Sequence, residues 1–329
     1  MGRKSIREED LVDLHGKVVL VTGGNAGIGY TTVQMLARKG AKVYMGARNG
    51  VRAAEAIERL KAENLGDGSV HWLEVDLSDP RLASQAAKEF LKREERLDIL
   101  INNAGLQPNE HHFKLTHDGL LDIMVINYLT ISLANRISPF VLTEALVPLM
   151  KRTAAEPGSD VRIVNVTSFR HTNVTPETLA SKEALNFNLG DSMTAKVHTY
   201  GHTKLANILH IKALQTQFDA EGVRITCLAP HPGVIATPGV HRAIVAAPLG
   251  WLLARVVERL FFKSSRCGAM PVAFAAAGPE VVGPKHKEYK GAYLTPMDVI
   301  ATSSKSAQDP RLQKELHETT ERIVRELGL

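Results

Sequence analysis

A glycine-rich turn near the amino terminus limits what this chain can fold into more than any other feature. The turn, Thr22-Gly23-Gly24-Asn25-Ala26-Gly27-Ile28-Gly29, directly follows the apolar run Val18-Val19-Leu20-Val21 and opens into a helical pattern. Glycines let the backbone bend sharply and approach a pyrophosphate, and the N-terminus of the next helix offers unpaired N–H groups with partial positive charge. We predict a nucleotide-binding βα turn here, with a tight turn of no binding function as the alternative. Its spacing, G-x-x-x-G-x-G, differs from the G-x-G-x-x-G of the commoner dinucleotide fingerprint.

The composition is typical of a soluble globular protein. Of 329 residues, 44% are hydrophobic and 23% are charged, with a net charge of +5. The positive residues are spread along predicted helix faces without runs, which argues against nucleic acid binding. Cys227 and Cys267 are too few for a disulfide framework, and the polar first 13 residues are no signal peptide. We expect one cytoplasmic domain over residues 1–329.

The most apolar segment, residues 243–262, contains Pro248, Gly250 and Arg255. A membrane-spanning helix needs about 20 uninterrupted apolar residues, so this segment does not cross a membrane. We expect an amphipathic helix that packs on the core or lies at an interface, which leaves peripheral membrane contact open.

Short apolar runs alternate with helical stretches, the pattern of a parallel sheet with crossover helices. Strands are expected at residues 17–21, 42–46, 70–75, 97–101, 161–167, 223–228 and 292–294. Helices are expected at residues 28–39, 51–62, 80–93, 118–150, 200–218 and 267–277, with a charged helical tail at about 305–329.

The ends of the second, third and fourth strands suit a dinucleotide at the carboxyl edge of the sheet, where open α/β folds bind ligands. Arg48 follows the second strand without an acidic neighbour; arginine suits the extra phosphate of NADP, whereas a carboxylate would bind the ribose hydroxyl of NAD. Asp76-Leu77 follows the third strand, where the carboxylate is placed to bind adenine, with a helix cap as the alternative. Asn102-Asn103-Ala104-Gly105 ends the fourth strand and lets the backbone lie beside a cofactor ribose.

Tyr200 and Lys204 lie four residues apart in a helical stretch, so they share one helix face. An ammonium near a phenol lowers the phenol pKa from about 10, which makes tyrosine a usable general acid or base. Ser168, at the end of the fifth strand, supplies a hydroxyl for a substrate oxygen. The Tyr-x-x-x-Lys spacing alone is weak evidence, because such pairs occur by chance on many helices.

In this order the motifs resemble the classical short-chain dehydrogenase/reductase family, whose pattern is T-G-x-x-x-G-x-G, N-N-A-G, a serine after the fifth strand, Y-x-x-x-K and P-G. Pro232-Gly233 supplies the last motif, and the resemblance covers about residues 14–295. The Ala47-Arg48 pair and the 32-residue interval from Ser168 to Tyr200 are similar to the retinol dehydrogenase-like branch, with residues 171–199 as an insertion over the active site. The resemblance implies an α/β fold, a Rossmann-type doubly wound parallel sheet of order 3-2-1-4-5-6-7 in three α/β/α layers.

The resemblance also implies roles. Ser168 would position a carbonyl oxygen, Tyr200 would exchange its proton, and Lys204 would bind the nicotinamide ribose and tune the phenol. The implied cofactor contacts are Thr22, Gly23, Asn25, Gly27, Ile28, Gly29, Arg48, Asp76, Leu77, Asn103, Ala104, Gly105, Tyr200, Lys204, Pro232, Gly233 and Thr237. The expected function is NADP(H)-dependent hydride transfer to or from a lipophilic carbonyl or alcohol, and the alternative is an NADP(H)-binding regulatory or scaffold protein without catalysis.

The family's fourth catalytic residue is an asparagine of helix four, and two residues compete for this role. Counting forward from Asp118 gives Asn127, whereas counting back from Pro139 gives Asn135, eight residues later. Eight residues exceed two helical turns, so a straight helix cannot put both at one depth. We expect Asn127, with an insertion near residues 129–136, because the chain before Asn127 has no other irregularity.

The apolar region 236–262 is expected to form a lid over an apolar pocket, which favours a lipophilic substrate. No metal site is expected, because the adjacent His111 and His112 cannot both face one ion and His198 and His202 have no third ligand nearby. The resemblance suggests a homodimer or homotetramer through helices four and five, a contact that the insertion could abolish.

Overall fold

The structure is a computed structural model that describes residues 6–77, 80–106, 114, 121–128, 139–187, 189–190, 192–233, 264–296 and 299–326. Its strands are β1 (Val18–Thr22), β2 (Lys42–Ala47), β3 (Ser69–Glu74), β4 (Ile99–Asn102), β5 (Val161–Asn165), β6 (Ile225–Pro230), β7 (Ala292–Thr295) and β8 (Val299–Ala301). Its described helices are α1 (Gly27–Ala37), α2 (Gly50–Ala62), α3 (Pro80–Arg93), α4 (Asp122–Asn127), α5 (Pro139–Ala155), α6 (Lys182–Leu185), α7 (Met193–Ala220), α10 (Ser265–Ala277), α11 (His286–Tyr289) and α12 (Pro310–Glu326).

The strands form one sheet in the order β3-β2-β1-β4-β5-β6-β7-β8. β1 to β7 are parallel, and β8 pairs antiparallel with β7 at the edge. The expected order 3-2-1-4-5-6-7 is therefore confirmed, with one further strand. The order reverses beside β1, because the chain first builds the sheet outward to β3 and then returns to place β4 on the other side of β1. Open α/β sheets bind ligands in the crevice that this reversal leaves at the carboxyl ends of the strands.

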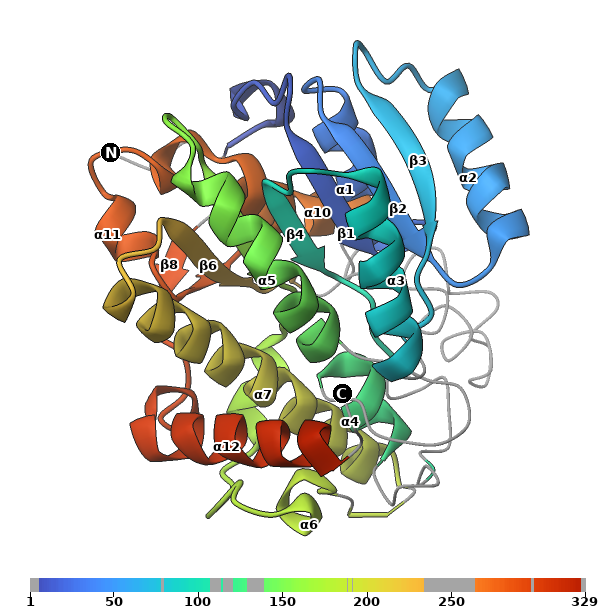
Figure 1. Cartoon of the computed structure of the whole chain (residues 1–329). Coiled ribbons are helices and arrows are strands. Elements are labelled where there is room, and N and C mark those ends of the chain that lie inside the picture. Colours follow the sequence, from blue (N-terminus) through green and yellow to red (C-terminus); the bar gives the residue numbers. More distant parts are fainter. Residues whose placement is uncertain are drawn as a thin grey trace.

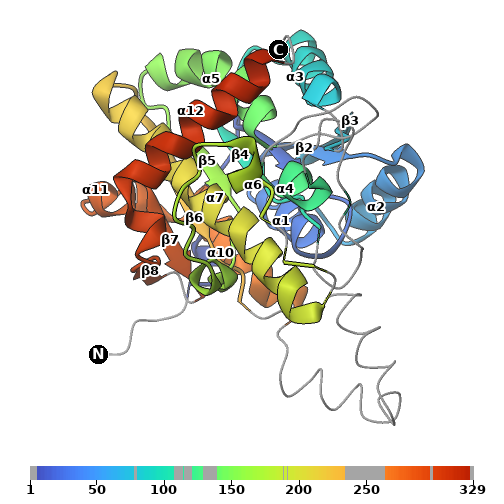
Figure 2. The same cartoon turned by 90° about the horizontal axis from the view of Figure 1, so that it is seen from below.

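The sheet lies between two layers of helices (Figures 1 and 2). Alternate residues of β1 enter separate cores, since side chains alternate across a strand. Val18 and Leu20 pack with the face covered by α3, α5 and α7, whereas Val19 and Val21 pack with the face covered by α1, α2 and α10. Burial on both faces explains why β1 is a continuous apolar run.

The single helix expected over residues 118–150 is wrong. α4 ends at Asn127, and Tyr128 leaves the helical region with φ −143° and ψ −64°. The Tyr128 ring is 1% exposed and packs edge-on against Phe140 and His210, with its hydroxyl 3.3 Å from the Thr320 hydroxyl of α12. The turn at Tyr128 therefore buries a large ring where a continued helix was expected. The segment 129–138, which contains Asn135, lies outside the described residues.

One further boundary differs from the expectation. α7 begins at Met193, seven residues before Tyr200, because the Ser192 hydroxyl accepts a hydrogen bond from the Ala195 N–H and caps the helix. The tail forms α12, which packs across α7 (Figure 1). Among the described helices, none is both long and apolar enough to span a bilayer. The apolar segment 243–262 and the expected lid lie outside the described residues.

Candidate active site

Thr22 connects the glycine turn to the end of β4. Its buried hydroxyl accepts hydrogen bonds from the backbone N–H groups of Asn103, at 3.0 Å, and Ala104, at 3.1 Å. In return, the Asn103 amide donates to the carbonyl oxygens of Thr22, at 2.9 Å, and Gly23, at 3.3 Å. Two motifs that are about 80 residues apart in sequence are therefore fixed to each other at the carboxyl edge of the sheet.

The glycines of the turn have different reasons to be glycine. A Cβ on Gly29 would lie 2.2 Å from the Gly23 carbonyl oxygen, so the backbone leaves no room for a side chain there. Gly23 has φ +64°, a backbone conformation that favours glycine. Gly27 also has a positive φ, +55°, but a Cβ there would meet nothing within 4 Å. The space beside Gly27 is open, at the point where α1 begins.

The N-terminus of α1 fits an anionic ligand. Its N-cap residue, Ala26, makes no side-chain hydrogen bond to the first turn, and that turn contains no acidic residue. First-turn N–H groups that no side chain caps are the donors that bind phosphate at helix N-termini. Together with the open space at Gly27, they form a cradle that suits the pyrophosphate of a dinucleotide. Asn25 and Ile28 flank this point of the chain.

Arg48 and Asp76 follow neighbouring strands at the same edge of the sheet. Arg48 is exposed and forms no ion pair within the described residues, and Asn49 caps α2 by accepting from the Arg52 N–H. Asp76 is half-buried, and Leu77 beside it is buried. The basic and the acidic side chain thus lie at the ends of β2 and β3, on the side of the glycine turn away from β4.

Tyr200 and Lys204 both lie on α7 and are nearly buried, at 8% and 4% exposure. The Lys204 Nζ lies 5.5 Å from the centroid of the Tyr200 ring. It donates a hydrogen bond of 3.1 Å to the carbonyl oxygen of Val166, just beyond β5. Burial lowers the pKa of Lys204 to about 8, because desolvation disfavours the ammonium form.

Asn127, the last residue of α4, is 1% exposed and borders Lys204. Its side-chain oxygen accepts from the Leu106 N–H at 2.7 Å, and its amide donates to the Leu106 carbonyl at 3.2 Å and the Thr203 hydroxyl at 3.0 Å. A Cβ on Gly105 would lie 3.0 Å from the Asn127 oxygen and 3.5 Å from the Lys204 Nζ. The structure therefore brings Asn127, Lys204 and Gly105 together.

Ser168 begins a 3₁₀ turn, Phe169–Asn173, that follows β5. Its hydroxyl oxygen accepts from the Arg170 N–H at 3.3 Å, which leaves the O–H proton available to donate. The turn touches α7 directly: a Cβ on Gly201 would lie 2.5 Å from the Arg170 carbonyl oxygen. Only glycine permits this approach, and it brings the serine-bearing turn against the helix residue that follows Tyr200.

Two residues near this site were missed from the sequence. Gly201 allows the close contact just described, and its position inside Tyr-x-x-x-Lys was the available signal. His171 is 1% exposed and bonds to the backbone of Ser168 on one side and of Ser304 on the other. No sequence pattern links residues so far apart.

Pro232 and Gly233 follow β6. Gly233 has φ +90°, and a Cβ there would lie 3.1 Å from the Pro296 ring. The His231 N–H donates to the Leu294 carbonyl at 2.7 Å, which ties this segment to β7. Thr237 lies outside the described residues.

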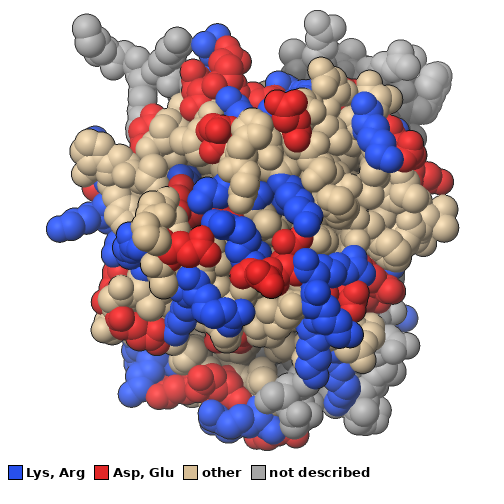
Figure 3. All heavy atoms as spheres, turned by 45° about the horizontal axis from the view of Figure 1, so that its top comes forward, with Lys and Arg blue, Asp and Glu red and all other residues tan. Residues whose placement is uncertain are grey.

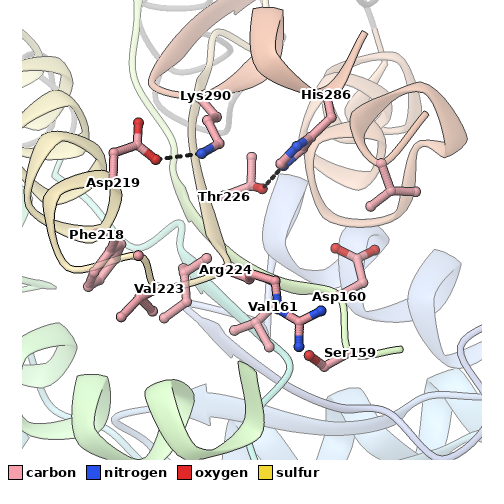
Figure 4. A pocket seen from close by; sticks show the side chains of 13 residues that line it. Ser159, Asp160, Val161, Phe218, Asp219, Val223, Arg224, Thr226, His286 and Lys290 are labelled. Atoms are coloured by element: carbon pink, nitrogen blue, oxygen red, sulfur yellow. Dashed lines mark hydrogen bonds and ion pairs between the residues drawn. The ribbon is translucent and has the colours of Figure 1, made fainter. Parts of the chain in front are cut away.

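The amino ends of β5 and β6 line a cavity of about 260 Å³ at the edge of the sheet opposite the glycine turn. Figure 4 shows its polar groups paired with one another: Asp219 with Lys290 at 2.5 Å and Thr226 with His286 at 2.9 Å. Arg224 donates to the Ala154 carbonyl at 3.1 Å. Because these polar groups already have partners, we place the candidate site at the carboxyl edge and not in this cavity.

The surface charges are mixed. Figure 3, with the top of Figure 1 turned forward, shows Lys and Arg interspersed with Asp and Glu.

Most of the chain is similar to known proteins. The family model for short chain dehydrogenases matches residues 17–244. A short-chain dehydrogenase/reductase of Armillaria gallica is 43% identical over 97% of this chain and 96% of its own length. Retinol dehydrogenase 14 of Mus musculus is 32% identical over 82% of this chain and 76% of its own length. The crystal structure of an uncharacterized protein from Mycobacterium paratuberculosis has a TM-score of 0.70 at 25% identity and covers 98% of both chains.

The match to the family model covers more than half of the chain, and the fungal relative spans nearly all of it. The glycine turn, the end of β4, the Ser168 turn and the Tyr200–Lys204 pair all fall within the matched residues. The chain belongs to the short-chain dehydrogenase/reductase family, whose members are oxidoreductases that use a nicotinamide cofactor.

Proposed function

We propose that this protein is an NADP(H)-dependent oxidoreductase that interconverts a lipophilic carbonyl compound and its alcohol. One observation carries the proposal: Tyr200 and Lys204 lie on one buried helix, packed through Gly201 against the Ser168 turn, with Asn127 beside Lys204. This arrangement lies at the carboxyl edge of the sheet, where the glycine turn is hydrogen-bonded to the end of β4.

The chain offers a contact for each part of the cofactor. The N-terminus of α1 would hold the pyrophosphate. Arg48 would pair with the 2′-phosphate of NADP(H), because an arginine binds a phosphate better than it binds the free ribose hydroxyl of NAD. Asp76 and Leu77 would line the adenine. The further contacts, toward the nicotinamide, would come from Asn103, Ala104, Gly105, Lys204, Pro232, Gly233 and Thr237. When bound, the cofactor supplies or accepts the hydride.

The remaining work falls to side chains of the chain. Ser168 donates a hydrogen bond to the substrate oxygen, and Tyr200 gives that oxygen its proton as a general acid. The ammonium of Lys204 stabilises the phenolate that is left, because both groups lie in a site of low dielectric constant. Asn127 holds the chain at Leu106 beside Lys204, where it is placed to join a proton relay.

Exposed apolar side chains support a lipophilic substrate. Met193 is 56% exposed and lies seven residues, or two helical turns, before Tyr200 on the same face of α7. Leu189, in the segment that leads into α7, is 57% exposed. The apolar sequence of residues 236–262 also supports a lipophilic substrate.

The test is a screen of lipophilic aldehydes and ketones with purified protein, following NADPH oxidation, with NADH as the control. Tyr200→Phe should reduce turnover by about a hundredfold or more, since general acid catalysis contributes about 10²–10⁴-fold. NADPH binding by the variant should persist. Equal turnover by Tyr200→Phe and wild-type protein would refute the mechanism. NADPH binding without turnover of any substrate would favour a regulatory or scaffold protein instead.

A further inference from the structure

We propose that His171 is a positioning residue, which fixes the turn that presents Ser168 by clamping it to the C-terminal segment 299–308. The inference rests on the proposed function, because it concerns how the Ser168 hydroxyl is directed at a substrate oxygen. His171 itself touches neither the substrate nor the cofactor in this proposal.

The two ring nitrogens of His171 bond to two distant parts of the chain. Nδ1 lies 2.8 Å from the carbonyl oxygen of Ser168, and Nε2 lies 3.1 Å from the backbone N of Ser304. A carbonyl only accepts and an N–H only donates, so Nδ1 must carry the proton and Nε2 the lone pair. One neutral tautomer satisfies both bonds. A protonated ring would direct an N–H at the Ser304 N–H and break the clamp.

The environment of His171 keeps the ring neutral. Burial and the nearby charge of Lys212 lower the pKa of His171, and its bond to the Ser168 carbonyl opposes this only in part. The ring packs edge-on against Tyr293 of β7, with centroids 4.9 Å apart. His231, on the segment after β6, is a further titratable group near the ring, and burial lowers the pKa of His231 to about 4.

The segment on the far side of the clamp is itself anchored. β8 pairs with β7, with Ala301 opposite Tyr293. Gln308 donates to the Ser303 carbonyl at 2.6 Å, and the Lys212 ammonium of α7 lies 3.4 Å from the Ser303 hydroxyl. The Ser304 N–H is thus held by the sheet edge, by α7 and by its own turn, which makes it a firm support for the imidazole.

The carbonyl group and the hydroxyl group of Ser168 are both held in place as a result. Its carbonyl oxygen accepts from His171, and its hydroxyl oxygen accepts from the Arg170 N–H, so the O–H proton points elsewhere. A misplacement of about 1 Å in a catalytic group costs up to about a hundredfold in rate. Loss of the clamp should therefore lower the rate of the chemical step while cofactor binding stays intact.

Two substitutions cut the clamp from opposite sides. His171→Asn keeps a donor near the Nδ1 position but cannot reach Ser304, and Ser304→Pro removes the N–H that His171 accepts. Ser304→Ala is the matched control, because it keeps that N–H and loses only the hydroxyl that caps Ala307. Each cut should lower kcat about tenfold, with KM and NADPH affinity within about twofold of wild type.

The double variant decides the case. Because each change breaks the same link, His171→Asn with Ser304→Pro should be no slower than the slower single variant. Multiplying losses, or full activity in either single variant, would overturn the proposal. His171→Gln, which reaches Ser304 but drops the Ser168 carbonyl, should be as slow as His171→Asn.

A second measurement separates this proposal from the proposed function. If the wild-type protein turns over no substrate, the oxidoreductase proposal fails. Nitrogen NMR of the His171 ring still tests the clamp, because it shows which ring nitrogen carries the proton. The wild-type ring should be protonated on Nδ1 alone at pH 7, and Ser304→Pro should shift the Nε2 resonance, because that nitrogen loses its hydrogen-bond donor. A wild-type ring protonated on Nε2 would overturn the clamp, whether or not the variants fold.

Discussion

The ammonium of Lys204 lies 5.5 Å from the centre of the Tyr200 ring and donates a hydrogen bond to the carbonyl oxygen of Val166. Within the described residues, no acidic group forms an ion pair with Lys204, so no carboxylate there neutralises its positive charge beside the phenol. Burial keeps water from screening this effect. The same burial makes the charge itself sensitive to pH.

We expect carbonyl reduction to depend on the protonation of Lys204. Its pKa of about 8 means that the ammonium is mostly present at pH 7 and is lost as pH rises through 8. The value of kcat/KM, which reports the free enzyme, should fall on the alkaline side over that range. Rates should be measured from pH 6 to 10 alongside Lys204→Arg, which stays charged. A profile that is level up to pH 10 would contradict the expectation.

Asn127 should matter for both activity and stability. Asn127→Ala removes three hydrogen bonds, to the Leu106 N–H, the Leu106 carbonyl and the Thr203 hydroxyl, and leaves buried polar groups unpaired. The expected cost is about 1–3 kcal/mol of unfolding free energy and at least about tenfold in kcat. Denaturant unfolding and steady-state kinetics measure the two effects. Asn135→Ala serves as the control; if it abolished turnover while Asn127→Ala did not, the two asparagines would have to exchange roles.

Arg48 should select between the two nicotinamide cofactors. Arg48→Ala should weaken NADPH binding by about tenfold, since a charge-assisted hydrogen bond contributes about 1.5 kcal/mol or more, and should leave NADH binding unchanged. Titration of cofactor fluorescence measures both constants. Arg59→Ala, which removes an equal charge from the last turn of α2, is the matched control. Equal losses for NADPH and NADH would argue against a contact with the 2′-phosphate.

His202 should make the protein sensitive to acid. It is 2% exposed and stacks on Phe187 at 5.0 Å, and neither ring nitrogen has a hydrogen bond of standard geometry within the described residues. Burial lowers its pKa from 6.5 to about 4, which the backbone of Ala184 offsets only in part. Since the unfolded chain binds the proton more tightly, stability is complete above pH 6.5 and is lost as pH falls toward 4. The shift corresponds to about 3 kcal/mol.

His202→Phe tests this expectation, because it keeps an aromatic ring against Phe187 and cannot titrate. The variant should gain stability over wild type as pH falls from 6.5 to 5, in melting curves taken at several pH values. His15→Phe is the control, since His15 is exposed and pairs with Asp13. Parallel pH dependences in the His202→Phe and wild-type proteins would show that this ring is not the acid-sensitive group.

Local patterns predicted the sheet well and the contacts across it poorly. β1, β2 and β5 lie within one or two residues of their expected bounds, because strands buried on both faces are continuous apolar runs. β8 has only three residues and is exposed or half-buried, so its apolar run is too short to predict a strand. The helix expected through Tyr128 ends at Asn127, and the Tyr128 ring packs on Phe140 and His210 with its hydroxyl beside Thr320 of α12. These contacts join residues up to almost 200 positions apart, so no local pattern predicts them.

In the candidate site, too, the sequence predicted local arrangements but not contacts between distant segments. The spacing of Tyr200 and Lys204 placed them on one helix, and the structure confirms that both lie on α7. The bonds from Thr22 to Asn103 and from His171 to Ser304 join residues more than 80 positions apart. A hydrogen bond between distant segments leaves no periodic trace in one sequence, so only the folded chain reveals it.

The bond from His171 to Ser304 also has a consequence for the order of assembly. A chain emerging from the ribosome folds from its amino-terminal end, and the glycine turn, β4 and the Ser168 turn are all made before residue 304. The glycine turn is hydrogen-bonded to Asn103 and Ala104, whereas the Ser168 turn is bonded through His171 to Ser304, which follows β8. Nascent chains that have not reached residue 304 should therefore complete the glycine turn before the Ser168 turn is fixed.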